Sequence, residues 1–242
     1  MKLKPYKREF EHSYACGVFP ACELAKTRPE ALKAVVITEK ALKNEGVMKL
    51  RGICDERKIP FEIDDATVAK IYPKDNVYAV GVFDKYSCEL DFSRNHVVLV
   101  NPSDMGNMGT IIRTMCAFEI FDLAIIRPCC DVFDPKVVRA SMGAVFKLNI
   151  RIYDTFEEYT RDVTETRQLI PFMLNGAPME SVRRQGEIFS LIMGNEAAGL
   201  PDNFINIGTP ARIMHASTVD SLNLPIATGI GIYYFSGLFG GK

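Results

Sequence analysis

Residues 98–114, VLVNPSDMGNMGTIIRT, form the first of three stretches whose residue types and spacing could do chemistry. An apolar run ends at Asn101, and Gly106 and Gly109 then open a segment with a helical pattern. A glycine-rich turn between a strand and a helix can bind a phosphate through its free backbone N–H groups. Arg113 follows one turn into this segment and would add a positive charge. The spacing matches neither G-x-G-x-x-G nor a P-loop with its lysine, so it predicts anion binding without specifying a nucleotide.

Two later stretches place polar side chains in similar positions. In LIMGNEAAGLPDNF, residues 191–204, an apolar strand pattern runs directly into Gly-Asn-Glu at residues 194–196. Glycines on both sides of an acid indicate that the backbone packs closely against a neighbour. In DSLNLPIATGI, residues 220–230, Ser221 and Asn223 stand where the last helical pattern begins. All three stretches therefore place polar groups at the junctions between elements.

Each of these polar residues also has an ordinary structural explanation. Asn107 and Ser221 have the residue type of a helix N-cap. Arginines such as Arg113 are common on exposed helix surfaces, and Asn195 would fit a simple turn. Residue types alone therefore leave both explanations open.

The sequence contains no arrangement typical of nucleophilic or metal-dependent catalysis. It has no G-x-S-x-G motif, and its three histidines, His12, His96 and His215, lack the spacing of metal ligands. None of the seven cysteines forms a C-x-x-C pair, and Cys129 and Cys130 are adjacent. We therefore expect reduced thiols in a cytoplasmic protein and no metal site.

Composition limits the class of protein. The 242 residues are 48% hydrophobic and 24% charged, which is enough to bury a full core in one large or two smaller domains. The 29 Lys and Arg residues against 30 Asp and Glu give a net charge of −1, so RNA binding would need a local basic patch. Residues 221–241 are uncharged and long enough to span a bilayer, but the asparagine, proline and glycines among them favour a buried helix. We expect no membrane contact.

The pattern of elements predicts two α/β regions on either side of a polar segment at residues 86–95. The first region alternates helices with short strands over about 90 residues. The second alternates helices with nearly continuous apolar strands, which is typical of a parallel sheet covered on both faces. Ligands of such sheets lie at the carboxyl ends of the strands. We therefore predict a small domain at residues 1–92 and a larger one at 93–242.

Taken in order, the three stretches resemble the SpoU/TrmH family of RNA ribose 2′-O-methyltransferases, part of the SPOUT superfamily. The family's first motif, Asn-x-Gly with an arginine four residues further on, corresponds to residues 107–113. Its second motif, G-x-E-x-x-G-L, corresponds to residues 194–200, and its third, S-L-N before a short apolar stretch, begins at residues 221–223. RASMGA at 139–144 is similar to the family's intermediate segment. The resemblance covers residues 96–240.

The resemblance implies an α/β fold with features that the hydrophobic pattern alone does not predict. It implies a C-terminal parallel-sheet SPOUT domain with a deep trefoil knot, and an obligate homodimer. A small α/β substrate-binding domain similar to a ribosomal protein would precede it and hold RNA. The sequence departs from the family in two loops. Met214 and His215 follow Ile213 in place of a frequent proline, and Met105-Gly106 precede Asn107 where many members have other residues.

The same resemblance implies S-adenosyl-L-methionine as the methyl donor, with no metal. The cofactor-binding positions would be Leu174, Asn175, Gly176, Gly194, Asn195, Ile213 and Leu222. The catalytic positions would be Asn107, Arg113, Glu196, Ser221 and Asn223.

The reaction implied is methyl transfer to a ribose 2′-hydroxyl, which is a poor nucleophile at neutral pH. The family assigns its activation to the arginine of the first motif, here Arg113. A guanidinium holds its proton to above about pH 12, which makes it a costly base but a good partner for phosphate or an oxyanion. We hypothesise that Arg113 binds the RNA phosphate beside the target ribose and lowers the pKa of the hydroxyl. Whether it acts as a base or as such a clamp stays open here.

Other classes of function compete with this one. A Rossmann-type nucleotide-binding protein would need G-x-G-x-x-G with an acid about 20 residues further on, and neither is present. A membrane-attached protein would use the uncharged C-terminal stretch. A catalytically silent RNA-binding homologue would have no need of Asn107, Arg113, Glu196 and Asn223 together. We favour an enzyme whose substrate is ribosomal RNA rather than transfer RNA, because an N-terminal substrate domain often accompanies ribosomal RNA targets in the family that the sequence resembles. A 2′-hydroxyl acceptor itself selects RNA over DNA.

Overall fold

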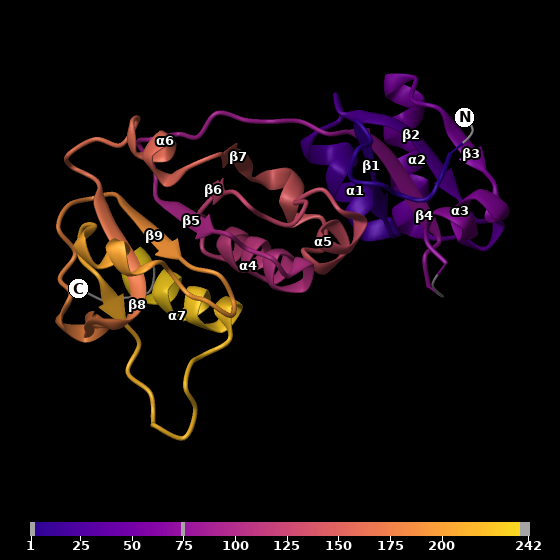
Figure 1. Ribbon diagram of the computed structural model, residues 1–242. Helices are drawn as coiled ribbons and strands as arrows, with labels where there is room; N and C mark the ends of the chain where they lie inside the picture. Colours follow the sequence, from indigo (N-terminus) through magenta and orange to yellow (C-terminus); the bar gives the residue numbers. More distant parts are fainter. Residues whose placement is uncertain (1–2, 74–75, 238–242) are drawn as a thin grey trace. The chain divides into compact units, whose positions relative to one another are not determined.

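The protein divides into two compact units (Figure 1). The computed structural model describes residues 3–73 and 76–237. The first unit comprises Met1–Tyr86 together with Asp131–Lys147, and the second comprises Ser87–Cys130 together with Leu148–Lys242. The chain therefore passes from one unit to the other three times.

The first unit is built on a four-stranded sheet with the order β1-β4-β2-β3. Strand β4 runs antiparallel to both β1 and β2, whereas β2 and β3 are parallel. The strands are β1 His12–Cys16, β2 Leu32–Ile37, β3 Phe61–Ile63 and β4 Ala79–Asp84, and the helices between them are α1 Val18–Thr27, α2 Glu45–Arg57 and α3 Asp65–Ile71. A mixed α/β unit is what the sequence predicted for this region.

Side-chain caps explain where two of these helices begin. The Asn44 side chain accepts hydrogen bonds from the first backbone N–H groups of α2, at 2.9 and 3.2 Å. The Asp64 side chain does the same for α3 through the N–H of Thr67, as the predicted cap of this helix requires. Val68 and Ile71 of α3 then pack into an apolar cluster with the buried valines of β2 and β4.

Residues 131–147 belong to the first unit although they follow β6 in the chain. Helix α5, Pro135–Ala140, begins with Asp134 as its cap and proline at its first position, as predicted. The rings of Phe133 and Phe146 lie edge-on to Phe83, with centroids 5.8 and 5.0 Å apart. This aromatic cluster fastens the returning segment to the core of the first unit. The assignment of residues 1–92 to RNA binding and of residues 93–242 to catalysis remains a prediction.

The second unit contains a six-stranded sheet with the order β10-β8-β9-β5-β6-β7. Every pairing in it is parallel, which confirms the predicted parallel sheet. The strands are β5 His96–Val100, β6 Asp122–Ile126, β7 Asn149–Tyr153, β8 Gln168–Pro178, β9 Phe189–Met193 and β10 Ala211–Arg212. The helices are α4 Met105–Ala117, α6 Phe156–Thr160 and α7 Leu224–Ser236.

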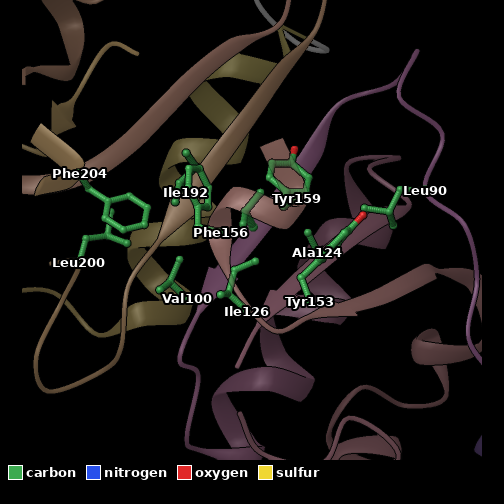
Figure 2. Packing of buried hydrophobic residues seen from close by; sticks show 11 residues of the cluster. Leu90, Val100, Ala124, Ile126, Tyr153, Phe156, Tyr159, Ile192, Leu200 and Phe204 are labelled. Atoms are coloured by element: carbon green, nitrogen blue, oxygen red, sulfur yellow. The ribbon is translucent and has the colours of Figure 1, made fainter. Parts of the chain in front are cut away.

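Apolar side chains bury both faces of this sheet. On one face, Val100, Ala124 and Ile192 of the strands pack with Phe156 and Tyr159 of α6 (Figure 2). Helix α7 contacts β9 and also packs against α4. Nearly continuous burial along β5, β6 and β9 explains why these strands read as apolar runs.

The amino-terminal end of the sheet carries a buried polar network. His96 Nδ1 lies 3.0 Å from the Tyr159 hydroxyl, and that hydroxyl lies 2.6 Å from Ser190 Oγ. Arg167 donates to the same Ser190 Oγ at 3.1 Å and to the Arg94 carbonyl oxygen. Burial, reinforced by the charge of Arg167, lowers the pKa of His96 to about 4. The imidazole is therefore neutral in the folded protein at neutral pH.

Several boundaries differ from those expected. Strand β1 was not predicted, and β8 extends over 11 residues to Pro178. Helix α4 begins at Met105, earlier than the expected start at Gly109, and α7 begins after Asn223. Helix α7 has 13 residues, and no helix among the described residues is long and apolar enough to cross a membrane. The last residues of the uncharged stretch lie outside the described ranges.

Candidate active site

A cavity of about 510 Å³ opens in the second unit, where the carboxyl ends of β8 and β9 meet β10. Three segments line it: residues 172–175 in the middle of β8, residues at the end of β9 and in the loop after it between 193 and 202, and residues between 212 and 227 around β10 and the start of α7. This position is where ligands of parallel sheets bind. The volume lies within the range of small-molecule sites.

The structure gathers most of the predicted cofactor positions around this cavity. Its lining includes Leu174, Asn175, Gly194, Asn195, Ile213 and Leu222. Gly176 is not among the described residues that line it. A Cβ on Gly176 would lie 2.8–2.9 Å from the backbone of Ala211, so this glycine permits the close pairing of β8 with β10 instead.

Gly194 marks the closest backbone approach at the cavity. A Cβ there would lie 2.2 Å from the carbonyl carbon of Gly199 and 2.3 Å from the nitrogen of Leu200. Asn195 and Gly199 exchange two backbone hydrogen bonds, at 3.1 and 2.9 Å, and Gly199 has a φ of +70°. The loop therefore folds back on itself as tightly as the two glycines predicted.

Asn195 shapes this loop and ties it to β5. Its side-chain oxygen accepts from the backbone N–H groups of Ala197 and Ala198, at 2.9 and 3.1 Å. Its side-chain nitrogen donates to the carbonyl oxygen of Asn101, at 2.8 Å. Asn195 thus combines the turn role, which the sequence left open, with a position in the cavity wall.

The Glu196 carboxylate binds the loop that leads from β5 into α4. It accepts from the backbone N–H of Ser103 at 3.1 Å, from the Ser103 hydroxyl at 2.8 Å and from the backbone N–H of Asp104 at 3.1 Å. Partial burial by itself would raise the pKa of Glu196, but these hydrogen bonds and one from its own backbone outweigh burial and lower it. Glu196 is therefore ionised at neutral pH and acts as an acceptor.

Asn107 lies in the first turn of α4 and completes this connection. Its side-chain nitrogen donates to Glu196 Oε1 at 3.4 Å. The expectation that Asn107 might cap the helix is wrong, because the cap is Asp104, which accepts from the Asn107 backbone N–H at 2.7 Å. The first two motifs therefore meet through Glu196.

Arg113 points away from these contacts. It is exposed on α4, it does not line the cavity, and across residues 3–73 and 76–237 its side chain has no hydrogen bond or ion pair. An unpaired guanidinium on an open surface is available to an anionic ligand from solution.

The third motif contributes Ser221 and Leu222 to the cavity wall. Ser221 is exposed and lines the cavity, whereas Asn223 does not line it. Ser221 was expected as a cap of the last helix, but Asn223 occupies the N-cap position of α7, and its side chain makes no capping hydrogen bond. A proline at the second residue of α7 displaces the helix start from the serine.

Sequence reasoning missed two groups of site residues. Ser103 and Asp104 lie inside the first stretch, and an aspartate three residues before Asn107 is a recognisable capping signal. Arg212 and Asp202 line the cavity as well. A charged residue in a short apolar strand next to Ile213 was the available signal for Arg212. No group of three or more potential metal ligands lies together within the described part of the chain.

Comparison with known proteins shows the family of the chain. The profile of the SpoU rRNA Methylase family matches residues 94–233. The chain is 25% identical over 232 residues to the 23S rRNA (guanosine(2553)-2′-O)-methyltransferase RlmP of Bacillus subtilis, covering 89% of this chain and 91% of that protein.

Solved structures share the fold over nearly the whole chain. The AdoMet-bound rRNA methyltransferase from Sinorhizobium meliloti matches with a TM-score of 0.78 and 27% identity, over 94% of this chain and 87% of that one. The SpoU methyltransferase AviRb from Streptomyces viridochromogenes, in complex with AdoMet, also has a TM-score of 0.78, at 20% identity over 93% and 89% of the two chains. The chain belongs to the SpoU rRNA methylase family of RNA 2′-O-methyltransferases.

Proposed function

We propose that this enzyme transfers a methyl group from S-adenosyl-L-methionine to a ribose 2′-hydroxyl of ribosomal RNA. The observation that carries the proposal is the cavity at the carboxyl ends of β8 and β9, which joins six predicted cofactor positions with Glu196 and Ser221. The names of the Bacillus subtilis and Sinorhizobium meliloti relatives support rRNA as the substrate class.

The cavity suits the donor in size and in lining. Leu174, Ile213 and Leu222 offer apolar surface to an adenine, and Asn175 and Asn195 offer amide groups at its edge. The bound donor supplies a methyl group on a positively charged sulfur. Gly194 keeps the backbone of the loop close enough to form one wall, because no side chain would fit at this position.

Arg113 would act on the acceptor. Its free guanidinium binds the phosphate beside the target ribose and stabilises negative charge on the 2′-oxygen. Glu196 and Asn107 hold the loop and the first turn of α4, so they set the position of the helix that carries Arg113. They are positioning residues in this proposal.

The proposal includes the finer architecture that the family resemblance implies. The chain segments around the cavity would form a deep trefoil knot, and the close packing of Gly194 on Gly199 and of Gly176 on Ala211 suits such threading. The first unit would hold RNA. The enzyme would act in the cytoplasm.

A homodimer is also part of the proposal, and helix α7 supports it. Ile226, Tyr233 and Tyr234 expose 56, 59 and 41% of their surface on this helix. Large apolar side chains gathered on one helix commonly mark an interface. A second copy of the chain would cover them.

The test is transfer of a labelled methyl group to RNA from a strain that lacks the gene. We expect incorporation into its ribosomal RNA at one 2′-O position, and none into ribosomal RNA from the parent strain, which is already modified. An Arg113→Met variant should bind donor but transfer nothing. Incorporation into the transfer RNA fraction alone would reject ribosomal RNA, and donor binding without incorporation into either RNA would favour a silent RNA-binding homologue.

A further inference from the structure

Arg212 brings a positive charge to the wall of the donor cavity. It is the second residue of β10, and it lines the cavity next to Ile213. The residue is half-buried, and its Nε atom is fully buried without a hydrogen-bond partner. A buried nitrogen of a charged side chain left without a partner costs free energy, so this arrangement needs a purpose.

Nothing in the described part of the chain neutralises this guanidinium. No hydrogen bond or ion pair joins the Arg212 side chain to another described residue, although three acids also line the cavity. Of these acids, Glu196 accepts hydrogen bonds from Ser103 and Asp104. Asp202 and Asp220 line the cavity without pairing with it.

The position of Arg212 distinguishes it from Arg113. Arg113 is exposed on α4 and faces solution, where an RNA phosphate can reach it. Arg212 lines the cavity and is only half-buried, so a group that enters the cavity can reach its guanidinium. A planar guanidinium fork matches a carboxylate geometrically.

We propose that Arg212 binds the carboxylate of the amino-acid end of the methyl donor and of its product, S-adenosylhomocysteine. This inference rests on the proposed function, which puts the donor in this cavity. The carboxylate is the one anionic group of the donor, and Arg212 is the one arginine or lysine among the described lining residues. Pairing the two satisfies the buried charge and fixes which end of the donor lies near β10.

The test separates the carboxylate from the rest of the ligand. Calorimetry measures binding of S-adenosylhomocysteine and of its decarboxylated analogue, S-adenosyl-3-thiopropylamine, which differs from it only by that group. Three proteins are compared: the unaltered enzyme, Arg212→Met, and Arg183→Met as a control, since Arg183 is exposed and lies outside the cavity. The side chains of arginine and methionine have similar reach, so Arg212→Met removes mainly the charge.

We expect loss of the carboxylate to weaken binding to the unaltered enzyme and to Arg183→Met by roughly ten- to hundredfold, the usual effect of a hydrogen-bonded charged group. For Arg212→Met the two ligands should bind within about twofold of each other, while the decarboxylated ligand keeps its affinity for all three proteins. Arg212→Lys should recover part of the preference.

Two results would overturn the assignment. One is an Arg212→Met protein that still prefers S-adenosylhomocysteine as strongly as the unaltered enzyme does. The other is an equal loss of both ligands in a folded variant, which would indicate a structural role. If the unaltered enzyme binds neither ligand, the proposed function itself fails, and this outcome is distinct from both.

Discussion

Glu196 and Ser103 are joined by two hydrogen bonds, one from the serine backbone N–H at 3.1 Å and one from its hydroxyl at 2.8 Å. Ser103 stands just before α4, whereas Glu196 follows β9. The pair therefore links the loop that lines the cavity to the start of the helix that carries Arg113. The acid of the second motif serves here as a fixed acceptor, since its pKa is lowered and it stays ionised at neutral pH.

Replacing Glu196 with glutamine should loosen this link. The amide keeps one acceptor oxygen but turns an NH₂ group toward the donors of Ser103 and Asp104. We expect kcat to fall by roughly ten- to hundredfold, with a smaller change in donor affinity. Amide hydrogen exchange at Ser103 and Asp104 should accelerate in the variant. Unchanged exchange alongside a lost kcat would instead make Glu196 a direct participant in the reaction.

The same contact has a pH dependence with a definite sign. Because the folded pKa of Glu196 lies below its unfolded value, the stabilisation is present above the unfolded pKa. It is lost as the pH falls through the folded pKa, below the usual titration range of a glutamate. The protection of the Ser103 amide against exchange, referred to an unstructured peptide at the same pH, should therefore fall on acidification more in the unaltered enzyme than in Glu196→Gln.

Alanine at Gly194 should disrupt the cavity. Its Cβ would overlap backbone atoms of Gly199 and Leu200, which cannot move aside as a flexible side chain would. We expect destabilisation of about 1–3 kcal/mol or more and loss of S-adenosylhomocysteine binding. Thermal unfolding and calorimetry measure the two effects. Gly52→Ala is the matched control, since nothing lies within 4 Å of that position, and it should stabilise α2 by up to about 1 kcal/mol.

Substitution of Arg113 should separate catalysis from donor binding. Arg113 does not line the cavity, so Arg113→Met should bind S-adenosylhomocysteine within about twofold of the unaltered enzyme. Its rate of methyl transfer should fall by roughly a hundred- to thousandfold, the usual effect of losing a group that stabilises developing charge. Single-turnover transfer to ribosomal RNA gives the rate. Near-normal transfer would remove Arg113 from the proposed chemistry.

The buried His96 makes the folded state sensitive to mild acid. Its pKa in the folded protein is lowered to about 4. Between that value and about 6.5, His96 is therefore protonated in the unfolded chain and neutral in the folded protein. Its contribution to stability is complete above about pH 6.5 and declines as the pH falls. From about pH 7 to about pH 5 the loss should be about 2 kcal/mol. Urea unfolding of His96→Asn, which cannot titrate, should show a smaller loss over this interval.

Charge on α7 should prevent the proposed dimer. Tyr233 is 59% exposed, so Tyr233→Glu should fold normally and place a charge on the expected interface. Sedimentation velocity should then find a monomer at concentrations where the unaltered enzyme is a dimer. Tyr78→Glu, at an exposed tyrosine of the first unit, is the control and should leave the dimer intact. Identical sedimentation of all three proteins would place any interface elsewhere.

Sequence patterns predicted the layers of the fold well and the boundaries less well. The strands β5, β6 and β9 are buried along their whole length, so each appears as an apolar run that cannot be mistaken. Strand β1, HSYAC, was missed because it mixes polar and small residues and because Ser13 is buried through a hydrogen bond rather than by apolarity. Tertiary contacts of this kind leave no local signal.

The site was predictable as a set of segments but not as a set of contacts. Glycines at 194 and 199 indicated a tight backbone approach, which the structure has. That Glu196 reaches Ser103 depends on two segments more than 90 residues apart in sequence, and no spacing rule gives that pairing. Arg212 was missed because a single arginine in a short apolar strand is a weak signal, and its place in the cavity wall is seen only in the structure.

Residues 131–147 belong to the first unit although they follow β6, and this limits how the enzyme can be re-engineered. Phe133 and Phe146 complete the aromatic cluster around Phe83, so that part of the first unit's core is encoded in the middle of the second unit's sequence. A chimera that exchanges the first unit at a single junction near residue 90 would combine the sheet of one parent with the Phe133 and Phe146 positions of the other. A transplant of substrate preference between relatives would therefore need two grafts, one at the amino terminus and one at residues 131–147, drawn from the same parent.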